Sequence, residues 1–276
     1  MNIKEKISEE IIRYVKKERD ACALHDDVCE DTGKGADSLW GEPLVGFADA
    51  KHPYIRNLKQ LVHPQHQMPE DVIPDARVVI VYFVPFNKWF QDTNTEAGLA
   101  SPEWAEGYEL TNAMMARLNK HIIDVVCALG YNAAVAPEAG IFYRDEVMSH
   151  WSFRHFGYAA GLGTFGLNNM LITEKGCAGR LGTVVTNLDI EPGGPQREEA
   201  CLYKRNGSCG ACVKRCPSGA LTADGFDRHA CYEQCLKNAQ VYDSFGSSYT
   251  DADETAGSEV CGKCVAGMPC ALKRPL

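Results

Sequence analysis

Apolar residues recur at helical spacing in two stretches of the chain. Near the amino terminus charged residues separate them, which predicts an amphipathic first helix over residues 3–15. Its apolar positions are Ile3, Ile7, Ile11, Ile12 and Val15. A longer helix is predicted to begin after Ser101, because this serine stands as an N-cap before Pro102 and Glu103. It ends at Gly130, and its apolar positions are Leu110, Met114, Leu118, Ile122, Val126 and Leu129.

Runs of β-branched and other apolar residues predict strands between the helices. We expect strands over residues 44–48, 77–86, 131–136, 170–173 and 181–188. The second run is apolar enough to be buried on both faces of a sheet. A further helical segment is expected over residues 145–160. This alternation predicts a layered body of the α/β or α+β kind.

The last part of the chain differs in composition from the rest. Pro192, Gly193, Gly194 and Pro195 indicate a linker within residues 190–199. We therefore expect a body at residues 1–192 and a second domain at residues 193–276. Nine of the thirteen cysteines lie in this second domain. In a chain with no export signal, such density is typical of metal ligation rather than of disulfides.

Charge and hydropathy argue against several classes of protein. The net charge of −9 is unfavourable for binding a nucleic-acid backbone. The longest apolar run, residues 78–86, is far shorter than the roughly 18 residues that a membrane-spanning helix needs. Eleven of the first twenty residues are charged, which leaves no room for the apolar region of a secretory signal. We expect a cytoplasmic protein without a membrane segment or a nucleic-acid partner.

The strongest signal for chemistry is a run of cysteines that ends in proline. Cys209, Cys212, Cys216 and Pro217 reproduce the last three cysteines and the proline of the bacterial ferredoxin run. In that run the closely spaced thiolates hold one [4Fe–4S] cluster, and the cysteine before the proline reaches a second cluster. A partner motif is therefore expected. Cys261-Gly-Lys-Cys264, followed by Cys270, provides it, and Cys231 and Cys235 lie between the two motifs.

Two clusters account for eight of these cysteines. Asn206 stands where the ferredoxin run has its first cysteine, so Cys201 must replace it from upstream. The crossover rule then predicts two ligand sets, with Cys235 as the alternative to Cys231. They are Cys201, Cys209, Cys212 and Cys270 for the first cluster, and Cys216, Cys231, Cys261 and Cys264 for the second.

A single structural zinc held by the two Cys-Gly-x-Cys motifs is the competing interpretation. It is disfavoured because it leaves Cys201, Cys216, Cys231 and Cys270 without a role. The remaining cysteines, Cys22, Cys29, Cys127 and Cys177, are expected to be small buried apolar residues.

Residues 161–166 form a literal Gly-x-Gly-x-x-Gly. A dinucleotide site requires a strand before this motif and a helix after it, and here the predicted order is reversed. The glycines indicate a tight helix-to-strand turn, or the close approach of a large planar cofactor to the backbone.

Two further stretches resemble a known family. Residues 151–166 end in Ala-Gly-Leu-Gly-Thr-Phe-Gly, and residues 179–188 read Gly-Arg-Leu-Gly-Thr-Val-Val-Thr-Asn-Leu. Both stretches and the cysteine-rich tail are similar to iron–sulfur proteins related to epoxyqueuosine reductase and, more distantly, to reductive dehalogenases. The resemblance extends from about residue 140 to 276 and is weaker over residues 44–86. Because Asp227 precedes Cys231 by four positions, as in the family's inter-motif ligand, the resemblance favours Cys231 over Cys235.

The resemblance implies an α+β fold. Its α/β body would be like that of nitroreductases and cobalamin-processing proteins, with two [4Fe–4S] clusters in a C-terminal ferredoxin-like domain. Better-known members bind cobalamin and reduce a small substrate with electrons that pass through the clusters. This sequence lacks the family's Arg-Gly-x-Asp-Tyr-His stretch, and Leu167 replaces the lysine of its Gly-x-x-Gly-Lys. Both departures argue against modification of tRNA.

The resemblance and the predicted elements together give candidate site residues. Glu138 ends a predicted strand, and Tyr143 and Asp145 lie at or near the start of the predicted helix over residues 145–160, so these three are candidate proton donors. His155, Gly161, Gly163 and Gly166 are the candidate residues that contact the cofactor.

We expect an iron–sulfur oxidoreductase that takes electrons from a low-potential donor. Its clusters would pass them to a corrinoid or another redox site in the body and so to a small-molecule substrate. The alternative is an electron carrier or reductive activator that serves a partner, such as a corrinoid protein, without substrate chemistry of its own.

Overall fold

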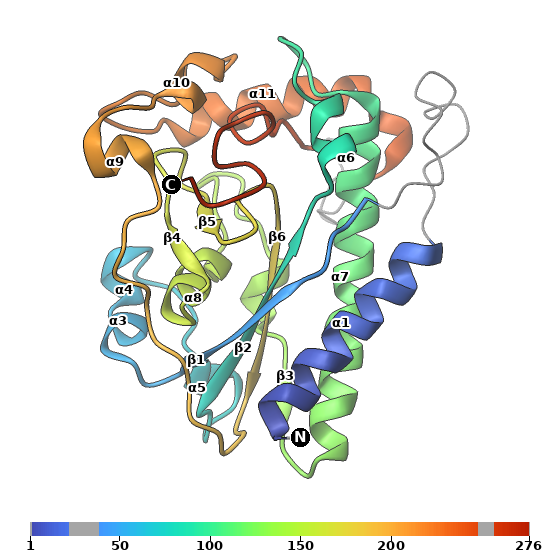
Figure 1. The fold of residues 1–276 in the computed structure, drawn as a ribbon, viewed down its shortest axis with the longest axis vertical. Helices are drawn as coiled ribbons and strands as arrows, with labels where there is room; N and C mark the ends of the chain where they lie inside the picture. The colour runs from blue at the N-terminus through green and yellow to red at the C-terminus, as the bar shows by residue number, and fades with distance from the viewer. Residues whose placement is uncertain (1, 22–38, 248–256, 276) are drawn as a thin grey trace.

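A four-stranded antiparallel sheet lies at the centre of the computed structural model, which describes residues 2–21, 39–247 and 257–275. The strand order is β1 (Leu44–Asp49), β2 (Val78–Pro85), β6 (Gly179–Thr186) and β3 (Ala133–Ala134). All three pairings are antiparallel, and they set Ile80 opposite Phe47 on one side and opposite Val184 on the other. The fold is therefore α+β rather than a parallel α/β arrangement (Figure 1).

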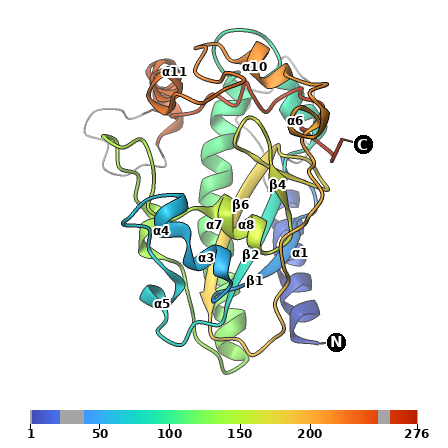
Figure 2. The same cartoon turned by 90° about the vertical axis from the view of Figure 1, so that its left-hand side faces the viewer.

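Every residue of β2 is buried, as its apolar run predicts. Alternate side chains of a strand point to opposite faces of the sheet. Ile80 and Tyr82 pack with the long helices α1 (Ile3–Ala21) and α7 (Pro102–Ala128) on one face. Val81 and Phe83 pack on the other face with the short helix α8 (Phe153–Ala159) and its neighbours. Figures 1 and 2 show the sheet enclosed between these two layers.

Shorter elements complete the fold. The short helices that precede α8 in the chain are α3 (Pro53–Arg56), α4 (Leu58–Leu61), α5 (Pro69–Val72), α6 (Lys88–Thr93) and η1 (Pro137–Gly140). A second, two-stranded antiparallel sheet consists of β4 (Gly163–Phe165) and β5 (Leu171–Thr173). The tail contributes α9 (Leu202–Asn206), α10 (Ala211–Arg215), α11 (Arg228–Val241) and η2 (Asp243–Phe245).

Two predicted elements differ from the structure. Residues 145–152 are not helical, because Tyr143 and Met148 pair as a short antiparallel bridge and Val147 has a left-handed φ of 50°. The helix begins only at Phe153. The strand expected over residues 131–136 is reduced to Ala133–Ala134, since Pro137 starts a 3₁₀ turn and the partner strand β6 ends at Thr186.

The cysteine-rich tail covers one end of the sheet. Helices α9, α10 and α11 lie there together with α6 (Figures 1 and 2). Val260, Val265 and Met268 share a buried apolar cluster with Trp104 of α7. The backbone also ties the tail to the start of β6, because the amides of Cys177 and Ala178 donate to the carbonyls of Cys270 and Ala271 at 2.9 and 2.8 Å. The boundary between residues 192 and 193 remains a prediction.

None of the described helices is long and apolar enough to cross a membrane.

The predicted N-cap of α7 gives a first test. Ser101 Oγ accepts from the amide of Trp104 at 3.1 Å and donates to Thr93 Oγ1 at 2.9 Å. Ser101→Ala should therefore lower the free energy of unfolding by about 1 kcal/mol, whereas Ser101→Asp keeps a cap acceptor and should lose less. Urea unfolding measures both changes, and equal midpoints for the wild type and Ser101→Ala would contradict the cap assignment.

Candidate functional site

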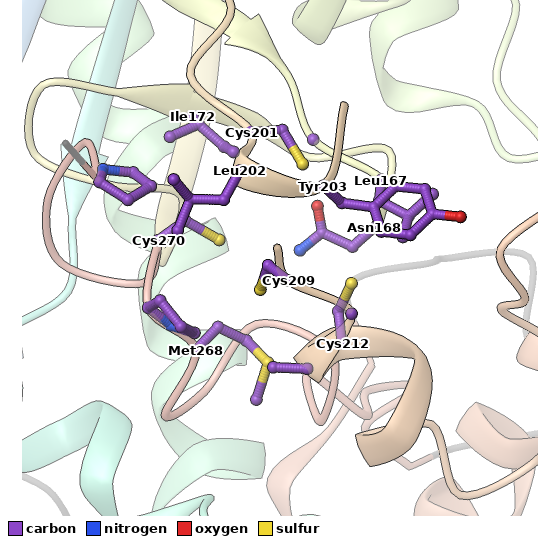
Figure 3. Close-up of a pocket in the computed structure, with 15 residues that line it drawn as sticks. Leu167, Asn168, Ile172, Cys201, Leu202, Tyr203, Cys209, Cys212, Met268 and Cys270 are labelled. Atoms are coloured by element: carbon purple, nitrogen blue, oxygen red, sulfur yellow. The ribbon is translucent and has the colours of Figure 1, made fainter. Parts of the chain in front are cut away.

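Four cysteines from separate parts of the tail line one cavity. Their sulfur atoms are directed toward the same space, as Figure 3 shows. The four residues are Cys201, Cys209, Cys212 and Cys270. Leu167, Ile172 and Met268 supply apolar parts of its wall. These are the thiols that the crossover rule places together on the first cluster.

Local structure explains how these four thiols meet. Cys201 is the residue before α9, and Gly207 ends that helix in a left-handed conformation with φ of 74°. The chain then returns through Cys209 to α10, which contains Cys212. Cys270 arrives from the end of the chain, where its carbonyl accepts from the amide of Cys177. A short helix, a tight turn and a backbone hydrogen bond thus fix the set.

The thiols of the second predicted set are electrostatic neighbours. Burial raises the pKa of Cys261 to about 11, and charge on Cys231 and Cys216 acts in the same direction. Burial also raises the pKa of the Cys264 thiol above its usual range, with Cys261 and Cys231 adding to the effect. Cys216 follows α10 and Cys231 lies in α11, so the set combines three parts of the tail.

Thiol protonation differs within each set. Burial raises the pKa of Cys212 to about 11, and charge on Cys270 and Cys201 adds to this. A hydrogen bond from Cys235 lowers the pKa of Cys231 to about 7. Because thiolates are the metal ligands, loading of these sites must release protons from the thiols of raised pKa.

The other cysteines fall into two groups. Cys177 is buried with its Sγ 3.8 Å from Cys270 Sγ, and Cys235 is hydrogen-bonded to Cys231, so both lie beside predicted ligands. The expectation that Cys127 is buried is wrong, because this residue is exposed on the outer side of α7. Cys22 and Cys29 lie outside the described residues.

The glycine motif forms the helix-to-strand turn that its order predicts. Gly161 follows α8 with φ of 77°, and a Cβ there would lie 2.5 Å from the carbonyl oxygen of Gly194. A Cβ on Gly163 would lie 2.1 Å from the carbonyl oxygen of Ile172. This chain's own backbone therefore accounts for both glycines. Gly166 differs because it lines the cavity of the first cysteine set, and its absent Cβ would meet Asn168 Oδ1 at 2.6 Å.

His155, the remaining candidate for cofactor contact, is held within the protein. Its Nδ1 lies 2.6 Å from Ser152 Oγ, and its ring packs against Phe165 with 4.8 Å between centroids. Burial lowers the pKa of His155 to about 4. The cofactor role of His155 and the three glycines stays a prediction.

Two of the three candidate proton donors lie in one hydrogen-bonded group. The Tyr143 hydroxyl donates to Glu138 Oε2 at 3.0 Å, and this bond raises the pKa of Tyr143. The buried His150 has Nδ1 3.7 Å from Glu138 Oε2 and Nε2 2.7 Å from Glu146 Oε2. Asp145 is exposed in the neighbouring turn and has no hydrogen bond or ion pair among the described residues.

Sequence reasoning missed His63 and Glu146 in this group. Ligand atoms of His63, Glu146 and His150 lie within 4.8 Å of one another, which raises the question of a metal site. The two imidazole rings are stacked with 4.3 Å between centroids and only 5° between planes. An imidazole nitrogen binds a metal ion that lies close to the plane of its ring. Because these two rings are stacked face to face, one ion could not lie close to both ring planes. Within the group, Tyr143–Glu138 and His150–Glu146 are hydrogen-bonded, whereas His150–Glu138 and His63–Glu146 are 3.7 and 3.6 Å apart. The group is thus a set of neighbouring proton-bearing side chains rather than a metal site.

An ion pair connects this proton-bearing group to the tail. Arg144, next to Tyr143, has Nη2 2.9 Å from Glu259 Oε1, and its Nη1 donates to the Tyr232 hydroxyl at 2.5 Å. Tyr232 in turn donates to Glu259 Oε2 at 2.8 Å. Because Tyr232 adjoins Cys231 in α11, the turn at residues 143–148 is fixed beside the second cysteine set.

Comparison with known proteins supports the resemblance seen in the sequence. No family model matches the chain. The epoxyqueuosine reductase of Listeria monocytogenes is 43% identical over 67 residues, which is 24% of this chain and 16% of that protein. The epoxyqueuosine reductase of Lactococcus garvieae is 46% identical over 67 residues, 24% of this chain and 17% of that protein. The similar segment thus spans about a sixth of the length of these relatives.

Solved structures share the fold over most of the chain. One epoxyqueuosine reductase has a TM-score of 0.56 at 16% identity, covering 99% of this chain and 67% of the other. Another, bound to an epoxyqueuosine-modified tRNA stem loop, has a TM-score of 0.54 at 18% identity, with 99% and 67% coverage. A catabolic reductive dehalogenase has a TM-score of 0.55 at 13% identity, with 84% and 30% coverage. The predicted resemblance and the α+β fold class are confirmed.

A buried histidine beside the proton-bearing group gives a test of pH dependence. His66 is fully buried, accepts from the amide of Ser152 at 3.1 Å, and burial lowers its pKa from 6.5 to about 4. The unfolded chain takes up this proton below pH 6.5, whereas the folded protein does not. Stability should therefore fall as pH drops from 6.5 toward 4, by up to roughly 3 kcal/mol.

His66→Gln removes the titrating group and keeps a neutral hydrogen-bonding side chain. Urea unfolding at several pH values should give a flatter profile for this variant over the same window. Parallel profiles for the two proteins would contradict the neutral, buried state of His66.

Proposed function

We propose that this chain is an iron–sulfur oxidoreductase that carries two [4Fe–4S] clusters. The first would be held by Cys201, Cys209, Cys212 and Cys270, and the second by Cys216, Cys231, Cys261 and Cys264. The observation that carries the proposal is the cavity lined by all four thiols of the first set, where Cys270 from near the end of the described chain joins three cysteines of residues 201–212. A cubane cluster with four thiolate ligands matches this donor set.

The zinc alternative fits the arrangement less well. A shared zinc would need Cys209 and Cys212 to meet Cys261 and Cys264 as one tetrahedron. Instead, Cys209 and Cys212 face Cys201 and Cys270 across one cavity. Cys231 and Cys216 are charge neighbours of Cys261, and a single zinc would leave them without a role.

Contacts between the two cysteine sets support electron transfer from one cluster to the other. Asn168 lines the first cavity, and its Nδ2 donates to the carbonyl of Cys264 at 2.9 Å. Charge on Cys212 also contributes to the raised pKa of Cys264. An electron from a low-potential donor would thus pass between adjacent clusters. Exposed Lys204, Arg205 and Lys214 around α9 and α10 favour docking of an acidic donor protein.

Three of the four residues predicted to contact a corrinoid are engaged by this chain itself, and Gly166 lines the cavity of the first cysteine set. Gly161 and Gly163 face this chain's own carbonyl oxygens, and His155 is engaged with Ser152 and Phe165. We therefore assign no step to a corrinoid within the body.

The hydrogen-bonded group at Glu138 would supply protons for reduction of an acceptor. Tyr143 and His150 contact Glu138, while Glu146 and His63 extend the group toward the surface. For a proton to return to Glu138 along this series, the gaps of 3.7 Å between His150 and Glu138 and 3.6 Å between His63 and Glu146 would have to close or be bridged by water. The net charge of −9 favours a small-molecule acceptor over RNA, although one structural neighbour binds a tRNA stem loop.

The electron-carrier alternative is favoured by one observation: this chain's own backbone occupies the space beside Gly161 and Gly163. If no redox cofactor approaches β4, the clusters could deliver electrons directly to a partner protein. Retention of turnover with a small acceptor distinguishes the two functions.

Removal of one predicted ligand tests the cluster assignment. Protein purified without oxygen should contain about eight iron and eight sulfide per chain, and Cys212→Ala should keep about half of each. Cys127→Ser is the matched control, because Cys127 is exposed and far from both sets in sequence. Unchanged iron in Cys212→Ala, or zinc in place of iron in the wild type, would overturn the assignment.

The proposed proton donor can be tested with a small epoxide, the functional group in the names of the relatives. Reduction to an alkene takes two electrons and two protons, breaks both carbon–oxygen bonds of the epoxide and releases water. Glu138→Gln should slow this reaction by about 100-fold or more while iron, sulfide and cluster reduction by dithionite stay unchanged. Asp124→Asn, an exposed carboxylate of α7, is the control.

An unchanged rate in Glu138→Gln would exclude it as the donor. A wild-type protein with both clusters and no turnover would favour the electron carrier.

A further inference from the structure

The indole N–H of Trp104 is buried without an acceptor. The side chain is 4% exposed, and Nε1 has no hydrogen-bond partner within the described part of the chain. Phe90 stacks on the indole with 5.1 Å between centroids and 18° between planes, and Phe86 meets it edge-on at 5.3 Å. These contacts fix the orientation of the N–H. A buried donor of this kind destabilises the protein unless an acceptor is present.

This N–H lies against the loop that carries two predicted ligands of the second cluster. Gly262 stands between Cys261 and Cys264 in the sequence. A Cβ on Gly262 would be 2.4 Å from Trp104 Nε1, so the indole occupies the space where that Cβ would be. Gly262 has φ of 69°, which also disfavours any larger residue there.

Asn94 fixes the distance between Trp104 and the loop. Its Nδ2 donates to the carbonyl of Cys261 at 2.8 Å, and its Oδ1 accepts from the amide of Ser101 at 3.2 Å. Ser101 is the N-cap that holds Trp104 in the first turn of α7. The cysteine loop and the indole are thus positioned by one buried side chain.

We propose that Trp104 Nε1 donates a hydrogen bond to a sulfur atom of the second cluster and raises its reduction potential. This inference rests on the proposed two-cluster function, because a cluster sulfur supplies the acceptor that the protein itself lacks. Reduction adds an electron to the cluster and makes its sulfur atoms more negative. A donor aimed at one of them stabilises the reduced form more than the oxidised form.

A buried cation acts in the same direction. Lys263 lies between the two cysteines of the loop, is 1% exposed, and its Nζ has Asn94 O at 3.4 Å. A buried ammonium with so little hydrogen bonding requires a nearby negative charge. Glu96 and the Cys261 thiolate act on Lys263 as negative charges, and a cluster held by that thiolate would add to them. The buried cation would thus raise the same potential.

Trp104→Phe separates the hydrogen bond from the packing, since phenylalanine keeps the aromatic contacts and removes the N–H. A redox titration of the anaerobic holoprotein followed by EPR should give a more negative potential for one cluster and an unchanged potential for the other. Trp40→Phe is the matched control, because it removes a buried indole N–H that donates to Thr111 Oγ1 at 2.8 Å. It should leave both potentials unchanged.

Two results would overturn the inference: unchanged potentials in Trp104→Phe, or equal shifts of both clusters. Iron and sulfide analysis of the same samples keeps the two proposals apart. A wild type without two clusters contradicts the proposed function, whereas two intact clusters with unshifted potentials contradict only the role of Trp104.

A measurement on the unmutated protein covers the case in which the variant does not fold. With ¹⁵N-labelled tryptophan, pulsed EPR of the reduced protein should detect one indole nitrogen coupled to one cluster. Absence of that coupling would also overturn the inference.

Discussion

The arrangement of the cysteines depends on the hydrogen bonds that tie the end of the chain to the start of β6. The amides of Cys177 and Ala178 donate to Cys270 and Ala271, so the last segment lies beside the central sheet. Without this attachment Cys270 would not be held beside the other thiols of the first set. A metal site assembled from remote ligands requires such a scaffold, because the ligands themselves repel one another once deprotonated.

The sheet makes the attachment possible through its two buried faces. Residues of β2 alternate between the layer of α1 and α7 and the layer of α8, so β2 and its partner β6 are fixed from both sides. The amino-terminal end of α7 then reaches the tail, where Trp104 and Asn94 contact the second cysteine loop. The group around Glu138 and His150 is joined to the cysteine-rich tail by the ion pair between Arg144 and Glu259.

Local patterns predicted the regular parts of this structure well. The N-cap at Ser101, the buried strand β2 and the first helix depend on short-range spacing, and each is present. The helix predicted over residues 145–152 was wrong, because Tyr143 and Met148 pair as a bridge and periodicity along the chain does not reveal such pairing. The four cysteines that the crossover rule assigns to the first cluster line one cavity, and their role as ligands stays a prediction. Residues such as Trp104, Asn94 and Asn168 belong to no motif, because their positions beside the cysteines follow from tertiary packing alone.

The central claim is that two separate iron–sulfur clusters lie next to each other in this chain. EPR of anaerobically purified and fully reduced protein tests it most directly. The account predicts about two unpaired electrons per chain, with spectra broadened by magnetic coupling between adjacent [4Fe–4S] clusters. A spectrum with a single uncoupled spin, or no signal from a protein that contains zinc, would contradict it.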